Sequence, residues 1–256
     1  MAEGVQSDLV QAVQVIHEAT VRHAPNGIRY ASFGDNNLDD KDLNHMVQAV
    51  PVAIAGALSR KIYYFVPLAL TDRRGSESTL VAPFYTPEFG DQAICHRNVT
   101  HDDNEGVFIS TRLLGDRFAL AFEFFINVAH AFVDVIGVPE AFDQLVWGQA
   151  LADVRGETSQ DAWESRNLSL AAKTDRILGK PVIDEKARNS FLESAFSDAV
   201  AIYQLSLSVD FDYSELRERE YPLLAPQALA ERLRLVAGLF PPNAGYEFAI
   251  RYRRRA

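Results

Sequence analysis

Apolar residues recur at the spacing of an α-helix over most of the second half of the chain. Gly115, Gly137, Gly156 and Pro181 interrupt this pattern, so it predicts several separate helices. The predicted helices span residues 116–136, 138–154, 160–178, 184–208 and 226–238. The same spacing predicts two more helices, at residues 5–22 and at residues 43–59, the second with a kink at Pro51.

Four shorter runs are rich in aromatic and β-branched residues and lie between turn-forming residues, which is typical of β-strands. These runs span residues 61–70, 79–86, 92–96 and 106–111. They predict one small mixed sheet, in which Pro67 and Pro83 favour edge positions or bulges because proline has no N–H to donate. A last aromatic segment, Tyr246 to Tyr252, predicts a further strand.

The chain has no internal repeat, low-complexity linker or change in composition that would divide it. We therefore expect a single domain over residues 1–256. Its class is α+β and mostly helical, with N-terminal helices and the small sheet in residues 1–104.

Composition and charge narrow the classes of partner and compartment. The chain is 48% hydrophobic and 23% charged, as in an ordinary globular protein. The net charge of -10 argues against a nucleic-acid partner, because phosphate binding needs clustered Lys and Arg. The only cysteine, Cys95, cannot form an intramolecular disulfide, and we expect it to be buried. Together with first residues that lack a signal-peptide pattern, this favours the cytoplasm.

The most informative segment is the apolar run from Phe118 to Ile136. Four polar residues interrupt it, at spacings of 4, 3 and 4: Glu123, Asn127, His130 and Asp134. At about 100° per residue, this spacing places all four side chains on one narrow face of a helix. The run approaches the length of a membrane span, but two carboxylates, an amide and an imidazole make insertion costly, so we expect no membrane.

Two interpretations of this polar face stay open. It faces solvent while the other faces pack in the core, or it lines an internal cleft. In a cleft, burial and proximity would make Glu123, His130 and Asp134 candidates for acid, base or ligand roles.

Two segments of the chain resemble a known family. Ile126 to Asp134 resembles a degenerate form of the HExxH helix of zinc metallopeptidases, and Gly106 to Ser110 takes the place of the edge strand before that helix. Residues 191–203, FLESAFSDAVAIY, resemble the downstream helix of the gluzincins. The chain thus resembles the lethal-factor-like, or minigluzincin, family over residues 105–235. The resemblance implies a zincin-like fold whose central helix carries the degenerate motif.

The resemblance also implies which residues of that helix would form the site. In an intact motif, two His at i and i+4 bind zinc, and the Glu beside the first polarises the attacking water. Here the first His position is Ile126 and the general-base position is Asn127, so only His130 is retained.

On the downstream helix, the glutamate ligand of the family maps to Ser194, with Glu193 one position away. Asp198 matches a supporting acidic residue, and Tyr203 matches the last position of the pattern. From the resemblance we expect the former cleft to be lined by Asp134, Ile126, Glu193, Ser194, Asp198 and Tyr203.

Other patterns are weaker. His96 and His101, with Asp102 and Asp103, have the residue types of a metal site in a loop, although such residues are usually just solvated. The chain has neither a glycine-rich phosphate loop nor a G-x-S-x-G elbow, so nucleotide binding and serine hydrolysis have no support.

Three hypotheses follow. A catalytic zinc needs about three protein ligands, so the first is a metallopeptidase-like protein that has lost zinc and activity, uses no cofactor, and binds a peptide or small molecule in the former cleft. The second is a metal-free enzyme in which His130, with Glu123, Asn127 or Asp134, performs acid–base chemistry on a small organic substrate. The third is a hydrolase in which Glu193, Glu123 or Asp134 serves as a substitute metal ligand.

Overall fold

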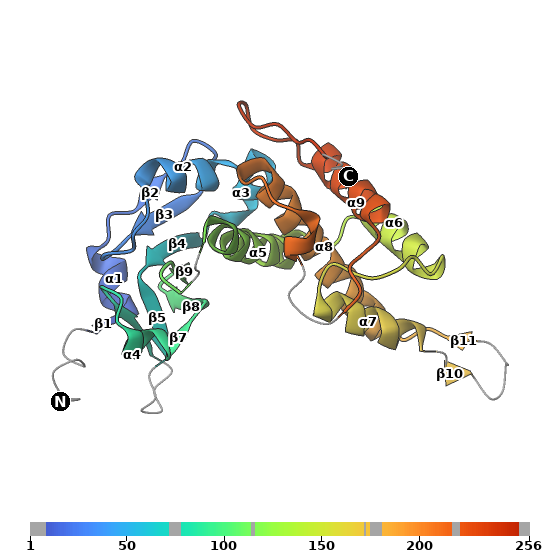
Figure 1. The fold of residues 1–256 in the computed structure, drawn as a ribbon, viewed down its shortest axis with the longest axis horizontal. Helices are drawn as coiled ribbons and strands as arrows, with labels where there is room; N and C mark the ends of the chain where they lie inside the picture. Colours follow the sequence, from blue (N-terminus) through green and yellow to red (C-terminus); the bar gives the residue numbers. More distant parts are fainter. Residues whose placement is uncertain are drawn as a thin grey trace. The chain divides into compact units, whose positions relative to one another are not determined.

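The computed structural model describes residues 9–71, 78–113, 116–171, 173–174, 181–216 and 221–250. It contains both α-helices and β-strands, as predicted for the α+β class (Figure 1). The chain divides into two compact units, Met1–Asn127 with Asn243–Gly245 and Val128–Pro242 with Tyr246–Ala256. This division falls within one helix rather than near residue 105, and the single-domain interpretation stays a prediction.

The first unit contains a five-stranded sheet with the order β2-β3-β4-β9-β8. Its strands are β2 (Arg22–His23), β3 (Arg29–Ser32), β4 (Lys61–Val66), β8 (His96–His101) and β9 (Asn104–Ser110). The three central strands are parallel, and β2 and β8 pair antiparallel at the two edges. The run Gly106 to Ser110 therefore lies in an internal strand, and the expectation that it forms the edge is wrong, because β8 folds back beside it.

The prediction of one small sheet is also wrong, because the same runs contribute to a second, four-stranded sheet with the order β1-β6-β5-β7. Its strands are β1 (Val10–Gln11), β5 (Leu68–Thr71), β6 (Thr79–Ala82) and β7 (Ala93–Ile94). Pro67 separates β4 from β5, so a single apolar run supplies a strand to each sheet. The Ser110 hydroxyl joins the sheets, since it accepts from Ala69 N at 2.7 Å and donates to Ile94 O at 2.6 Å.

Short helices complete the first unit: α1 (Ala12–Glu18), α2 (Asp40–Gln48), α3 (Val52–Ala55) with the 3₁₀ turn η2 (Gly56–Leu58), and α4 (Pro87–Gly90). The predicted kink at Pro51 is a complete break between α2 and α3. Tyr64 and Val66 of β4 share a buried cluster with Val15 of α1. Because side chains alternate along a strand, Tyr63 and Phe65 lie on the other face of the sheet.

Helix α5 (Arg117–Ile136) matches its predicted bounds to within one residue. Asp116 caps it, because its Oδ1 accepts from Ala119 N at 2.7 Å. Within the first unit, the Phe124 ring lies 5.1 Å from the Tyr63 ring and 5.6 Å from the Phe65 ring. The first half of α5 is thus held against the face of the five-stranded sheet opposite α1.

The second unit is mainly helical. Its elements are the end of α5, α6 (Glu140–Leu151), α7 (Gln160–Leu170), β10 (Lys173–Thr174), β11 (Pro181–Val182), α8 (Glu185–Ser208), the 3₁₀ turn η3 (Tyr213–Leu216) and α9 (Pro226–Leu239). Helix α8 is buried along most of its length and packs against α7 and α9. The helix predicted at 160–178 ends at Leu170. Residues 246–250 form no strand, and Arg251 and Tyr252 lie outside the described residues.

A buried charge cluster joins the helices of the second unit. The Glu157 carboxylate is fully buried and lies 2.8 Å from Arg232 Nη1 of α9 and 3.3 Å from Arg166 Nη1 of α7. Arg232 Nε also donates to Gln149 Oε1 of α6 at 2.8 Å. Buried charges are tolerated only when they are paired and hydrogen-bonded, so these contacts fix how α6, α7 and α9 pack around the residue.

Replacing Arg232 by Met should lower the free energy of unfolding by about 3–5 kcal/mol, because it leaves a buried carboxylate with an incomplete set of partners. Arg234→Met is the matched control, since Arg234 is exposed on the same helix. Urea unfolding followed by circular dichroism measures both. Equal losses in the two variants would contradict the structural role of Arg232.

Candidate functional site

The polar face of α5 changes in exposure along the helix. Glu123 is partly buried and Asn127 is 9% exposed, whereas His130 and Asp134 are exposed. The face is therefore not wholly in solvent. Glu123 and Asn127, which belong to the first unit, contact each other, and Glu123 also contacts His96 of the five-stranded sheet.

Glu123 is the centre of a three-residue cluster in the first unit. Its Oε1 lies 2.5 Å from Nδ1 of His96, which is on the edge strand β8. Asn127 Nδ2 donates to the same oxygen at 3.1 Å and to the Glu123 backbone oxygen at 2.8 Å. Glu123 and Asn127 lie one helical turn apart on α5, and His96 is the first residue of β8. We name these three residues (His96, Glu123 and Asn127) the His96 cluster.

The His96 cluster has the form of a carboxylate-oriented imidazole. In the tautomer that donates from Nδ1 to the Glu123 carboxylate, Nε2 is the ring nitrogen that is left to accept or deliver a proton. The His96 side chain is 44% exposed, so the imidazole ring is partly open to solvent. This geometry allows acid–base chemistry, although at His96 rather than at His130.

The pairing of His96 with Glu123 was not predicted, because the predicted strand ended at His96 and residues 97–101 were expected to form a loop. Residues 96–101 form β8, and His96 and His101 point to opposite faces because they are an odd number of residues apart. The ring of His101 packs on that of His17 from α1, with centroids 4.9 Å apart. The sequence signal that could have predicted the hairpin is the turn-forming pair Asp102-Asp103, and the structure places Asp102 in the left-handed region with a φ of 50°. Cys95, expected to be buried, is exposed.

The residues at the other motif positions lie in different surroundings. Ile126 is partly buried on α5. On α8, Glu193 is exposed and Ser194 is partly buried. Asp198 and Tyr203 are both buried within the second unit. The expectation that the six residues line one former cleft stays a prediction.

Asp198 and Tyr203 have buried partners. Thr158 Oγ1 donates to Asp198 Oδ2 at 2.7 Å, and the Tyr203 hydroxyl donates to Phe240 O at 2.8 Å. Burial raises the pKa of Tyr203 to about 12. Burial likewise raises the pKa of Asp198 to about 6, against hydrogen bonds that lower it, so this carboxyl holds its proton to unusually high pH.

The described residues also bear on a metal site and on a membrane span. Among the described residues, no group of three or more His, Cys, Asp or Glu side chains is placed to hold a metal ion. By length and composition alone, Arg117–Ile136 is able to cross a membrane, and 56% of its most apolar window is buried in the structure. Buried core helices pass the same test, and the expectation of no membrane stays a prediction.

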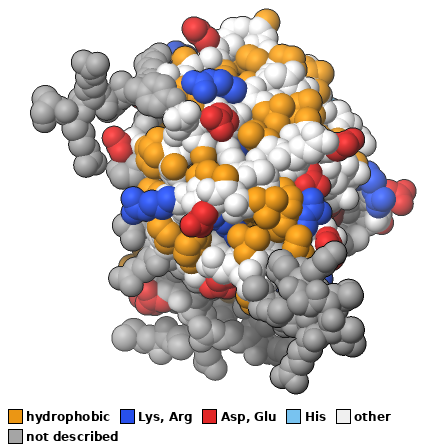
Figure 2. Space-filling model, turned by 90° about the vertical axis from the view of Figure 1, so that its right-hand side faces the viewer, with side chains coloured by type: hydrophobic (Ala, Val, Ile, Leu, Met, Phe, Trp, Pro, Cys, Tyr) orange, Lys and Arg blue, Asp and Glu red, His pale blue; other side chains and the backbone are white. Residues whose placement is uncertain are grey.

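The described surface carries exposed hydrophobic side chains among charged ones. Val135, Leu151 and Leu168 are 60%, 61% and 64% exposed. On the face drawn in Figure 2, hydrophobic side chains lie in patches between acidic and basic ones. The expectation of no nucleic-acid partner stays a prediction.

Comparison with known proteins gives no relative from which to transfer a function: no family model, curated protein or solved structure matches the chain. The gluzincin resemblance therefore stays a prediction that rests on the residues themselves.

Asp198→Asn should make the protein more stable than wild type at neutral pH but not near pH 4. The folded-state pKa of Asp198, about 6, lies above its ordinary value of 3.8, so the unfolding free energy of wild type falls as pH rises between these values. Hydrogen bonds from Ser159 and Thr158 and the positive charge of Arg232 lower the pKa of Asp198. The negative charge of Glu157 raises it. Asparagine mimics the protonated form, so the gain at pH 7.5 should be on the order of 1–3 kcal/mol.

Urea unfolding of wild type and Asp198→Asn at pH 4.5 and pH 7.5 measures this effect. Asp161→Asn, an exposed residue of α7, is the control for the loss of one negative charge. A stability difference between Asp198→Asn and wild type that does not change with pH would contradict the raised pKa.

Proposed function

We propose that this chain is a metallopeptidase-like protein of zincin-like fold that has lost its zinc site and binds an extended peptide along the outer edge of β8. The residues at the motif positions support the loss of zinc. Ile126 has no ligand atom, and the Asn127 amide is committed to Glu123 and accepts no proton at neutral pH. Ser194 supplies only a hydroxyl where the family has a carboxylate.

The observation that carries the proposal is the unpaired outer edge of β8. Ser110 N donates to Cys95 O at 2.9 Å, so these two residues form a hydrogen-bonded pair in the antiparallel ladder. Such pairs alternate along a ladder, so the backbone N–H and C=O groups of His96, Asn98 and Thr100 point away from β9. In the described part of the chain, no backbone hydrogen bond reaches these groups from outside.

The side chains on this edge favour a peptide over other partners. His96, Asn98 and Thr100 are exposed on the face where His96 meets Glu123 of α5. A peptide added to β8 would gain backbone hydrogen bonds, each contributing about 0.5–1.5 kcal/mol net. Its alternate side chains would lie beside the His96 cluster, which supports selection by sequence.

Asn98→Pro is the sharpest test of strand addition. Proline at position 98 removes an N–H that points away from β9, so no hydrogen bond between β8 and β9 is lost. Proline also restricts the residue before it to the β region, which Arg97 already adopts within β8. We expect the variant to fold as wild type does but to lose at least tenfold in affinity, about 1.4 kcal/mol, for ten-residue peptides selected on the wild-type protein.

Asn98→Ala is the control, because it keeps the N–H and should change affinity less than threefold. Fluorescence anisotropy with labelled peptides measures binding, and circular dichroism checks the fold. The proposal fails if a folded Asn98→Pro variant binds these peptides as tightly as wild type, or if no peptide of the selection library binds wild type.

A second function, metal-free acid–base catalysis, is favoured by the 2.5 Å contact between His96 Nδ1 and Glu123 Oε1. Under this alternative, His96→Ala should lower turnover of chromogenic p-nitrophenyl esters by about 100-fold or more. His130→Ala should leave it within about twofold. Equal rates for wild type and His96→Ala, measured by absorbance, would exclude His96 as the acid–base residue.

A further inference from the structure

Strand β8 has a second face, which carries the side chains of Arg97, Val99 and His101. Successive side chains of a strand point to opposite faces, so these three lie on the side of the sheet away from Glu123. Val99 packs against the buried cluster that includes α1, and His101 contacts His17 of α1. We name this side of the five-stranded sheet the α1 face. A peptide added to β8 would present every second side chain to it.

Arg97 gives the α1 face a positive charge at the start of β8. Its side chain is partly buried, and in the described part of the chain its guanidinium has no ion pair or hydrogen bond. A guanidinium is always charged and offers its N–H donors in a planar fork that matches a carboxylate. The other residues that β8 and β9 place on this face include no Asp or Glu: Val99, His101, Asn104, Gly106, Phe108 and Ser110.

The nearest carboxylates along the strand do not cancel this charge. Asp102 and Asp103, in the turn after β8, are five and six residues from Arg97, which is about 17 Å or more along an extended strand. Exposed charges at this separation are largely screened, because the Debye length is about 8 Å at physiological ionic strength. A negative group brought close to Arg97 would therefore experience mainly the guanidinium.

The ladder places Arg97 where a side chain of an added strand would approach closely. The backbone groups of Arg97 point toward β9, whereas those of His96 and Asn98 point outward. In an antiparallel pair with a peptide, the residue opposite Arg97 would thus belong to a non-hydrogen-bonded pair, whose Cα atoms are about 4.5 Å apart. Directly opposite residues share a face, so its side chain would lie beside the guanidinium on the α1 face.

We propose that the peptide bound at β8 carries an aspartate or glutamate opposite Arg97, so that the protein selects acidic extended segments. This inference rests on the proposed strand addition at β8 and adds a choice of sequence to it. A carboxylate at this position forms the ion pair that no described residue of the chain supplies to Arg97. A lysine or arginine there would place two like charges in a close cross-strand pair, which is unfavourable.

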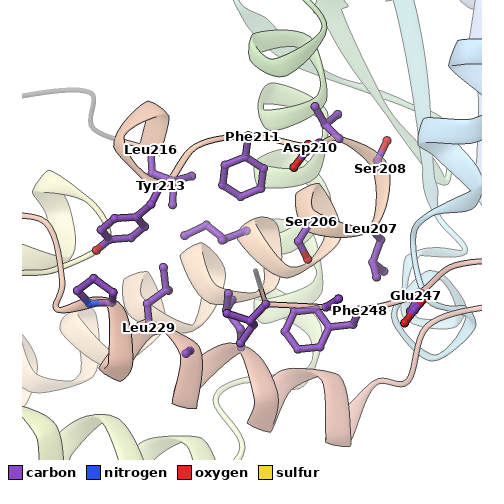
Figure 3. A pocket seen from close by; sticks show the side chains of 17 residues that line it. Ser206, Leu207, Ser208, Asp210, Phe211, Tyr213, Leu216, Leu229, Glu247 and Phe248 are labelled. Atoms are coloured by element: carbon purple, nitrogen blue, oxygen red, sulfur yellow. The ribbon is translucent and has the colours of Figure 1, made fainter. Parts of the chain in front are cut away.

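A pocket of about 380 Å³ in the second unit is another place where a library peptide could bind (Figure 3). Figure 3 shows Asp210 and Glu247 near this pocket, together with aromatic and aliphatic side chains. The described lining contains no Lys, Arg or His, so an acidic side chain would find no cationic partner there. A preference for acidic peptides therefore distinguishes the edge of β8 from this pocket.

Selection from a randomised library of ten-residue peptides on wild type and on Arg97→Glu tests the proposal. We expect wild type to select Asp or Glu at one position of the peptide, and Arg97→Glu to select Lys or Arg at that position. In fluorescence anisotropy, exchanging Glu for Lys at this position should weaken binding to wild type roughly fivefold or more. The same exchange should strengthen binding to Arg97→Glu.

Two further variants assign the preference to this arginine. Arg97→Gln, which adds no negative charge, should bind the Glu and Lys peptides about equally. Arg234→Glu makes the same charge change as Arg97→Glu at an exposed position of α9, and it should keep the wild-type preference. Circular dichroism checks that each variant folds, which is expected at position 97 because the guanidinium has no described ion pair to lose.

The outcomes separate this inference from the function on which it rests. It is overturned if wild type selects no acidic residue, or if folded Arg97→Gln keeps the preference. If the selected peptides then still lose affinity in Asn98→Pro, strand addition at β8 stands and only the acidic preference fails. If no peptide binds wild type, or if Asn98→Pro binds as tightly as wild type, the proposed function fails and this inference fails with it.

Discussion

The second unit depends on the burial of Glu157 between Arg166 and Arg232. A carboxylate without exposure to water requires both guanidinium groups, and these come from α7 and α9. Gly156 makes this burial possible: its φ is +79°, and a Cβ there would come within 2.1 Å of Leu223 O. The close approach allows Glu157 N to donate to Pro222 O at 3.0 Å, which leads the chain into α9.

In the first unit, the corresponding constraint is the hairpin of β8 and β9. Because β9 pairs on both sides, the edge of the sheet is formed by β8, whose outward residues share a face with the start of α5. This places a histidine from a strand against a carboxylate from a helix, and it leaves backbone groups available beside them. The proposed peptide site and the alternative acid–base site therefore arise from one arrangement. The peptide site would use the outward backbone groups of β8, and the acid–base site would use the imidazole of His96.

The sequence predicted the long helices well because burial of a continuous apolar face imposes its period directly on the residues, as in α5, α8 and α9. It could not predict that neighbouring runs enter two sheets, since strand pairing depends on partners far away in the chain. The contacts that define the sites are equally distant: His96 and Glu123 are 27 residues apart, and Glu157 and Arg232 are 75 apart. The motif positions Ile126 and Asn127 were proposed by resemblance, but a sequence pattern does not say which side chains surround them in the fold.

The proposed function requires that no zinc binds at the positions of Ile126, Asn127 and Ser194, and metal analysis tests this requirement most directly. The untagged protein would be purified without chelators, incubated with zinc, desalted and analysed by elemental mass spectrometry. We predict well below one zinc per chain both before and after incubation, because a catalytic zinc needs about three protein ligands and, of the motif positions proposed by resemblance, only His130 has a zinc-binding side chain of the expected type. Close to one zinc per chain, lost in His130→Ala, would contradict the account and indicate a metal site rebuilt from substitute ligands.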